Sequence, residues 1–122
     1  MRKSDKKIDN QLRLALTDVC EHALELYSGF EWITHSVDYG SFPKSLRIVC
    51  VFDTEQQLRQ FNHQGHKATL LAHIKHNLTD VGIVLHNIDK QVSFDTETAC
   101  QQQHHGNWAL RLSATIINNK FH

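Results

Sequence analysis

The sequence is poor in the residues that mark the more specialised classes of protein. One proline and five glycines among 122 residues exclude a collagen-like chain and argue against a disordered one. The three cysteines include no CxxC pair, so we expect neither a disulfide scaffold nor a redox motif, and a reducing cytoplasm is the expected compartment. No apolar run approaches the roughly 18–20 residues of a membrane helix. What remains is one globular domain over residues 1–122, long enough for one core and too short for two.

Net charge of one sign is also missing, because 13 Lys and Arg residues balance 13 Asp and Glu residues. This balance excludes a strongly basic nucleic-acid-binding protein. The basic groups are nevertheless unevenly placed, since the first seven residues include four of them and one acid. We therefore expect residues 1–7 to form a basic arm ahead of a weakly acidic body, with the cations Arg2, Lys3, Lys6 and Lys7. No apolar stretch follows this arm, so a secretory signal is not expected.

Histidine is the residue present in excess, at 10 of 122 positions. Imidazole groups titrate near pH 6.5, and a histidine buried in its neutral form opposes folding in acid. The histidine count therefore predicts that stability falls through about pH 6 if several of these side chains are buried.

In the first half of the chain, hydrophobic periodicity predicts one helix and a hairpin. An apolar stripe at helical spacing predicts a helix over residues 5–27, which Ser28 and Gly29 end; the stripe is Ile8, Leu12, Ala15, Val19, Ala23 and Leu26. Residues 30–39 and 45–52 alternate as strands do. The turn at 40–43 is short, so these strands are predicted to pair antiparallel. Phe30 is expected on the same face as Trp32.

The second half predicts two helices, a strand and a less certain tail. Asp53 is expected to cap a helix through Phe61, with Gln56 completing the cap. After the break at 62–65, a second helix is expected over 66–79 and a third strand at 83–88, extended irregularly through Phe94. A short helix over 95–103 would be capped by Asp95 or Thr96. Residues 101–107 are expected to be a mobile loop, and residues after Trp108 form either a strand or a helix.

These elements follow the order α-β-β-α-α-β, with an uncertain C-terminal helix or strand. One helical layer on a small three- to four-stranded sheet would bury the apolar stripes most simply, which defines an α+β domain. The tetrapeptide Phe-Asp-Thr-Glu occurs at 52–55 and again at 94–97. We interpret both copies as a strand end followed by a helix cap.

Two groups of histidines have spacings that could serve a metal ion. The first is H-x2-H-x6-H-x2-H, made by His63, His66, His73 and His76. Imidazole is a good ligand for zinc, copper or nickel, but the rise from residue 66 to 73 is about 10 Å, so one ion needs help from another segment. The second group is Cys100 with His104 and His105. The alternative for both is a solvated polar surface without a cofactor.

No catalytic motif is present, because the chain contains no GxSxG, HExxH, P-loop or GxGxxG sequence. Cys50, His35 and Asp38 could meet across the hairpin, yet Cys50 shares a strand face with apolar residues and is expected to be a packed thiol. We therefore expect a protein that is not an enzyme. The aromatic residues could form a stacking or protein-binding surface or belong to the core; they are Trp32, Tyr39, Phe42 and Trp108.

Four stretches of the chain, residues 2–10, 29–35, 49–54 and 92–97, carry a further resemblance. They resemble a small uncharacterised bacterial family whose members are often labelled Fis-type transcriptional regulators. A regulator of that type reads DNA through a basic C-terminal helix-turn-helix. Residues 98–122 supply only Arg111 and Lys120 as fixed positive charges, so no helix-turn-helix is evident there.

The predicted element order also resembles that of the type II KH domain, and of its ribosome-binding factor A variant. In KH domains a GxxG loop between the two central helices clamps the nucleic-acid backbone. The corresponding loop here, residues 62–67, contains the single glycine Gly65 and no GxxG. This resemblance implies an RNA- or ribosome-associated module, in which the basic arm is joined by Arg13, Gly65 and Lys67.

The sequence favours a small cytoplasmic binding domain over an enzyme. A protein partner or a second copy of the chain is the expected target, because an open sheet edge invites pairing. The alternatives are the RNA-associated module and a histidine-based metal-binding protein. Salt-sensitive binding would indicate nucleic acid, whereas loss of stability with a chelator would indicate a metal.

Overall fold

The computed structural model describes the backbone of residues 2–120 and the side chains of residues 2–114. Three strands form one mixed sheet in the order β1-β2-β3. Strand β1 (Phe30–Ser36) pairs antiparallel with β2 (Arg47–Phe52), and β2 pairs parallel with β3 (Val92–Thr96). The predicted α+β class, the order α-β-β-α-α-β and the antiparallel hairpin are confirmed.

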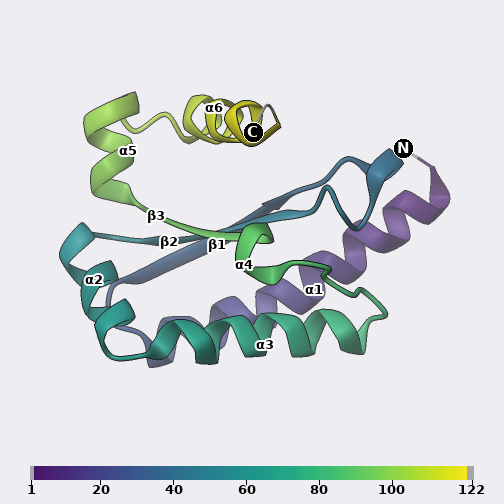
Figure 1. Ribbon diagram of the computed structural model, residues 1–122, viewed down its shortest axis with the longest axis horizontal. Coiled ribbons are helices and arrows are strands. Elements are labelled where there is room, and N and C mark those ends of the chain that lie inside the picture. The colour runs from purple at the N-terminus through teal and green to yellow at the C-terminus, as the bar shows by residue number, and fades with distance from the viewer. Residues whose placement is uncertain (1, 121–122) are drawn as a thin grey trace.

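The predicted helical layer covers one face of this sheet. Helices α1 (Lys3–Leu26) and α3 (His66–Asp80) run side by side beneath it, as Figure 1 shows, while α2 (Glu55–His63) closes one end. The short helix α4 (Ile88–Gln91) leads into β3. Their apolar stripes meet the sheet in one core, whose fully buried side chains include Leu12, Val19, Ile48, Phe52, Leu70, Ile74 and Leu78. Burial of such stripes is the main force that stabilises helices of this kind.

The other side of the sheet carries the two C-terminal helices. Helices α5 (Glu97–His104) and α6 (Trp108–Lys120) lie above the sheet in Figure 1. Since successive residues of a strand point to opposite faces, Trp32 and Asp95 lie on this side, and both bind these helices. The sequence left open whether residues after Trp108 form a strand or a helix, and they form the helix α6.

A β-bulge in β1 changes which side chains reach the core. Phe30 pairs with Phe52, but Trp32 pairs with Val51, so β1 contains one extra residue at Glu31. The prediction that Phe30 shares a face with Trp32 is therefore wrong. Instead the Phe30 ring meets Phe52 edge to face at 5.5 Å, inside the core.

The third strand is formed only by the last part of the predicted segment, from Val92 onward, and the prediction is wrong for residues 83–88. Residues 83–87 form no strand; Ile83 and Leu85 are buried there as an irregular segment after α3. The strand begins instead at Val92, which is the residue that pairs with Ile48 of β2. Buried Gln91 secures this position, because its side-chain amide donates to the Pro43 and Leu46 carbonyls at 2.9 and 3.2 Å.

Two predicted irregular segments are helical. Helix α1 begins at Lys3, so Lys3, Lys6 and Lys7 of the expected basic arm belong to its first two turns, Arg2 is its N-cap, and Met1 lies outside the described residues. Asp5 favours this start, since an acidic side chain in the first turn complements the helix dipole. The expected mobile loop over 101–107 is wrong for 101–104, which complete α5. That helix ends at His105, whose φ of 55° is left-handed.

The two Phe-Asp-Thr-Glu copies begin helices through threonine, not aspartate. Thr54 caps α2 by accepting from the Gln57 backbone N–H at 3.2 Å, so Asp53 and Gln56 were the wrong residues for this cap. Thr96 caps α5 in the same way. The copies lie side by side, since Phe52 pairs with Thr96 across the parallel strands.

Candidate functional site

The junction between α2 and α3 is an exposed break between two helices. Gly65 there has a φ of +78°, a left-handed conformation that glycine adopts without strain. A Cβ atom added to Gly65 would meet nothing within 4 Å, so the space in front of it is open. No side chain caps the first turn of α3, which leaves its backbone N–H groups available to a ligand.

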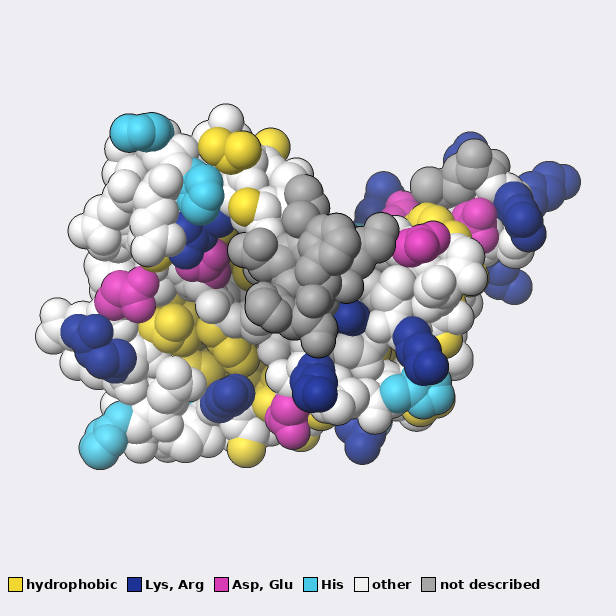
Figure 2. All heavy atoms as spheres, turned by 45° about the horizontal axis from the view of Figure 1, so that its top comes forward, with side chains coloured by type: hydrophobic (Ala, Val, Ile, Leu, Met, Phe, Trp, Pro, Cys, Tyr) yellow, Lys and Arg dark blue, Asp and Glu magenta, His cyan; other side chains and the backbone are white. Residues whose placement is uncertain are grey.

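A cation and an aromatic ring flank this junction. The Lys67 ammonium lies 5.6 Å from the centre of the Phe94 ring. Phe94 belongs to the edge strand β3 and is only partly buried, against Phe61 at 5.7 Å. Figure 2 shows hydrophobic side chains gathered on one face of the molecule, with Lys, Arg, Asp and Glu side chains around them. The part of such a ring that reaches the surface beside a cation can contact a base while the ammonium meets a phosphate.

The structure does not bring the predicted nucleic-acid-binding residues together. Gly65 and Lys67 lie near the C-terminal end of α1, where the Tyr27 and His66 rings are 5.3 Å apart. Arg2, Lys3, Lys6 and Lys7 lie at its opposite end, and 24 helical residues span about 36 Å. Arg13 lies between the two groups. A single short ligand therefore meets one group or the other.

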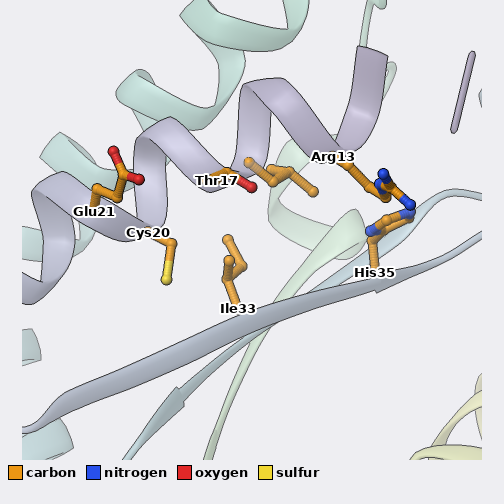
Figure 3. A pocket seen from close by; sticks show the side chains of 7 residues that line it. Arg13, Thr17, Cys20, Glu21, Ile33 and His35 are labelled. Carbon is orange, nitrogen blue, oxygen red and sulfur yellow. The ribbon is translucent and has the colours of Figure 1, made fainter. Parts of the chain in front are cut away.

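Arg13 lines a separate groove between α1 and β1. This groove has a volume of about 270 Å³ and runs over Ile33, with Arg13 and His35 near one end and Cys20 near the other (Figure 3). Burial, opposed by a hydrogen bond with the Ile33 backbone, raises the pKa of the Cys20 thiol, so it is mostly protonated near neutral pH.

The predicted constellation of Cys50, His35 and Asp38 is not formed. Cys50 is fully buried, and burial raises the pKa of its thiol to about 12. His35 faces Asp9 instead, with 3.5 Å between Nε2 and Oδ1. The Asp38 carboxylate accepts from the Gly40 backbone N–H at 3.0 Å. His35 and Asp38 each have another partner, and the full burial of Cys50 confirms the expectation of a packed thiol.

The four regularly spaced histidines also diverge. His66 packs against the Tyr27 and Phe61 rings, and His76 lies 3.3 Å from Asp80. His73 faces α1, where it meets Asp18 and His22. Among the residues with described side chains, one group could hold a metal ion, and it consists of Asp18, His22 and His73. The potential ligand atoms of these three side chains all lie within 4.8 Å of one another. The spacing Asp-x3-His on α1 was visible in the sequence, but its juxtaposition with α3 was not.

The second predicted metal group is also absent. Cys100 is fully buried and its pKa is raised by burial, which keeps the thiol protonated. The His104 ring instead contacts the Arg111 guanidinium, with 3.1 Å between Nδ1 and the guanidinium nitrogen. His105 is exposed at the end of α5.

None of the nine histidines with described side chains is buried. The condition for acid destabilisation through buried neutral imidazoles is therefore not met in this part of the chain. His22 shows the opposite tendency: its hydrogen bond to the Asp18 backbone carbonyl, together with the Asp18 carboxylate, raises its pKa.

The four aromatic residues, for which the sequence left both a surface and a core position open, make contacts within the fold. The Trp32 and Trp108 rings meet edge to face at 4.7 Å, and their indole N–H groups donate to the two carboxylate oxygens of Glu97, at 2.6 and 3.1 Å. Tyr39 donates to Asp9, and Phe42 packs on the core. These contacts attach α6 to the sheet through two indoles that are both partly buried.

Taken together, the fold defines an α+β domain whose two central helices are joined at a glycine between parallel strands. No family model, no curated protein and no solved structure matches the chain. In residues 2–120, no helix is both long and apolar enough to cross a membrane.

Proposed function

We propose that this chain is a KH-like domain that binds single-stranded RNA at the α2–α3 junction. The observation that carries the proposal is the position of the junction: a left-handed glycine between two helices, beside an edge strand, in a chain with the type II KH element order. KH domains clamp the nucleic-acid backbone with the loop at this place. The departure from GxxG leaves one glycine to allow the close approach of a phosphate.

The groups at the junction suit a single strand better than a duplex. Backbone N–H groups at the start of α3 and the Lys67 ammonium can meet phosphate oxygens. The Phe94 ring offers a stacking surface for one unpaired base. A base that is paired and stacked inside an RNA duplex cannot reach this surface. The edge of β3 adds backbone groups that no strand pairs with in the described part of the sheet.

Electrostatics set the expected character of this binding. The chain has no net charge, and Lys67 is the cation that the α2–α3 junction places beside the proposed RNA site. On a single strand each phosphate contact contributes a slope of about −0.7 to log K against log salt. Binding is therefore expected to be moderate in affinity and only weakly salt-dependent, because stacking and hydrogen bonds supply most of it.

The test is fluorescence anisotropy of labelled single-stranded RNA titrated with the full chain at about 50 and 200 mM salt, the range over which phosphate contacts weaken. Lys67→Glu is expected to weaken binding several-fold, because it replaces the cation with a like charge to phosphate. Lys75→Glu, an exposed lysine on the same helix about two turns further along, is the matched control and should bind as the wild type does.

Absence of binding at 50 mM salt, or an equal loss in both variants, would contradict the proposal. The expected protein partner or second copy would then become the leading candidate, with the open edges of β1 and β3 as the first surfaces to test. An RNA-binding role would place the chain in the cytoplasm, where its three thiols stay reduced.

A further inference from the structure

We propose that Asp18, His22 and His73 form a site for a divalent transition-metal ion of the zinc type. The site is separate from the α2–α3 junction and uses none of its residues. Asp18 and His22 lie one turn apart on α1, and His73 faces them from α3. Their ligand atoms lie within 4.8 Å of one another, on the exposed side of the seam between the two helices.

The distances fit the coordination sphere of a small ion. Two donors held tetrahedrally at about 2.1 Å from zinc lie about 3.4 Å apart. His73 Nε2 lies 3.5 Å from Asp18 Oδ2, and His22 Nδ1 lies 3.5 Å from Asp18 Oδ1. The two imidazole rings are 5.3 Å apart and almost perpendicular, at 85°, so both can approach one ion without a clash between the rings. Small rotations of exposed side chains would complete the set.

A neighbouring amide already orients the carboxylate. Asn77, one turn after His73 on α3, donates from Nδ2 to Asp18 Oδ2 at 2.7 Å and to the Ala15 carbonyl at 3.2 Å. Hydrogen bonds of this kind hold a ligand in place and contribute to metal affinity. His22 would exchange its present 2.8 Å contact with the Asp18 backbone carbonyl for a bond to the ion, or offer its other ring nitrogen.

The donor set indicates the class of ion. Two imidazoles and one carboxylate suit zinc, cobalt, nickel or copper better than calcium or magnesium, which prefer oxygen ligands. Three protein ligands leave one position for water or for an outside ligand. A bound ion would also join α1 to α3, so it should stabilise the fold through linkage.

The experiment is calorimetric titration of the untagged full chain with zinc chloride, together with thermal unfolding in one equivalent of zinc or in EDTA. We expect one tight equivalent per chain and a rise in Tm with zinc. His73→Gln and His22→Gln should each weaken this equivalent at least about tenfold and abolish the rise in Tm. All three ligands are part-exposed or exposed, so circular dichroism of the variants should match the wild type.

His76→Gln is the matched control, since it removes an exposed histidine that also lies beside a carboxylate on α3. It should keep the zinc equivalent and the rise in Tm. The proposal is overturned if zinc fails to bind, if His73→Gln binds it as tightly as the wild type, or if His76→Gln loses it to the same degree. RNA binding by Lys67 is measured separately in EDTA, so failure of one proposal leaves the other standing.

Discussion

At the scale of single residues, burial determines how each of the three thiols behaves. Cys50 and Cys100 have no exposed surface, whereas Cys20 is partly exposed in the groove between α1 and β1. Burial raises the pKa of all three thiols. The thiolate is the reactive form of cysteine. The two buried thiols are therefore protected twice, because reagents cannot reach them and because their raised pKa keeps them protonated.

Thiol labelling should therefore separate the cysteines. At pH 8 a chromogenic disulfide reagent should react with one thiol per native chain, slowly compared with a free thiol, and with three in urea. Cys20→Ser should remove the native-state reaction. A native chain of that variant that still reacts at the original rate would show that a buried thiol is reachable.

Cys50 also predicts how stability depends on alkaline pH. The pKa of its thiol is near 9 in an unfolded chain and about 12 in the fold. A raised folded pKa contributes stability that is complete below pH 9 and is lost as the pH rises toward 12, because the unfolded chain releases the proton first. At pH 10.5 the loss is at most about 2 kcal/mol, from 1.36 kcal/mol per pKa unit.

Urea unfolding at pH 8 and pH 10.5 measures this effect. Cys50→Ala lacks the thiol and should lose less stability between the two values than the wild type, whatever its stability at pH 8. The same loss in both proteins would assign the pH dependence to tyrosines and lysines instead.

At the scale of elements, α6 is attached to the sheet by its first turn. Arg111 binds Asp95 of β3 through two hydrogen bonds, at 2.6 and 2.8 Å, and this pair is only 12% and 18% exposed. A bidentate, largely desolvated pair of this geometry is the strong kind of ion pair. The hydrogen bonds that Arg111 donates to the Asp95 carboxylate raise the pKa of Arg111 further, so the charge persists at any accessible pH.

Arg111→Ala should release α6. The variant leaves Asp95 without its main cation, which costs about 2 kcal/mol or more. Since Trp32 and Trp108 are the only tryptophans, their fluorescence reports on this joint, and the emission should shift to the red as the indoles enter water. Arg59→Ala, an exposed arginine on α2, is the control and should leave the emission unchanged. Unchanged emission in Arg111→Ala would mean that the indole–Glu97 contacts hold α6 alone.

At the scale of the whole molecule, Lys67 and the N-terminal lysines lie near opposite ends of α1. Lys67 adjoins the proposed RNA site, and the N-terminal lysines lie about one helix length away. The two ends therefore contribute independently to any binding.

Neutralising the N-terminal cations should change RNA affinity little. The triple variant Lys3→Gln, Lys6→Gln, Lys7→Gln is expected to bind a short single strand within about twofold of the wild type, because long-range attraction is largely screened beyond the roughly 8–10 Å Debye length. Anisotropy with a strand of about six nucleotides gives the measurement. A loss larger than that of Lys67→Glu would move the binding surface to the start of α1.

The sequence was sufficient for the elements that local patterns determine. The apolar stripe of α1 and the alternation in β2 predicted both elements within two residues. The sequence misplaced the start of β3. Ile83 and Leu85 have the apolar pattern of a strand, but they are buried in an irregular segment, and the strand begins where Val92 pairs with Ile48. Asp18 and His73 are 55 positions apart, so their meeting required the packing of α1 on α3.

The parallel pairing of β2 with β3 has a consequence for synthesis of the chain. Ile48 pairs with Val92, and Phe52 pairs with Thr96. The two residues of each pair are 44 positions apart in the chain, so β2 is synthesised well before β3. The hairpin and α1 are complete much earlier. On a translating ribosome the first half of the domain therefore emerges with one edge of β2 unpaired, and an unpaired strand edge in a partly folded chain is prone to aggregation. The pairing of β2 with β3 is complete only after Thr96 has left the exit tunnel of the ribosome.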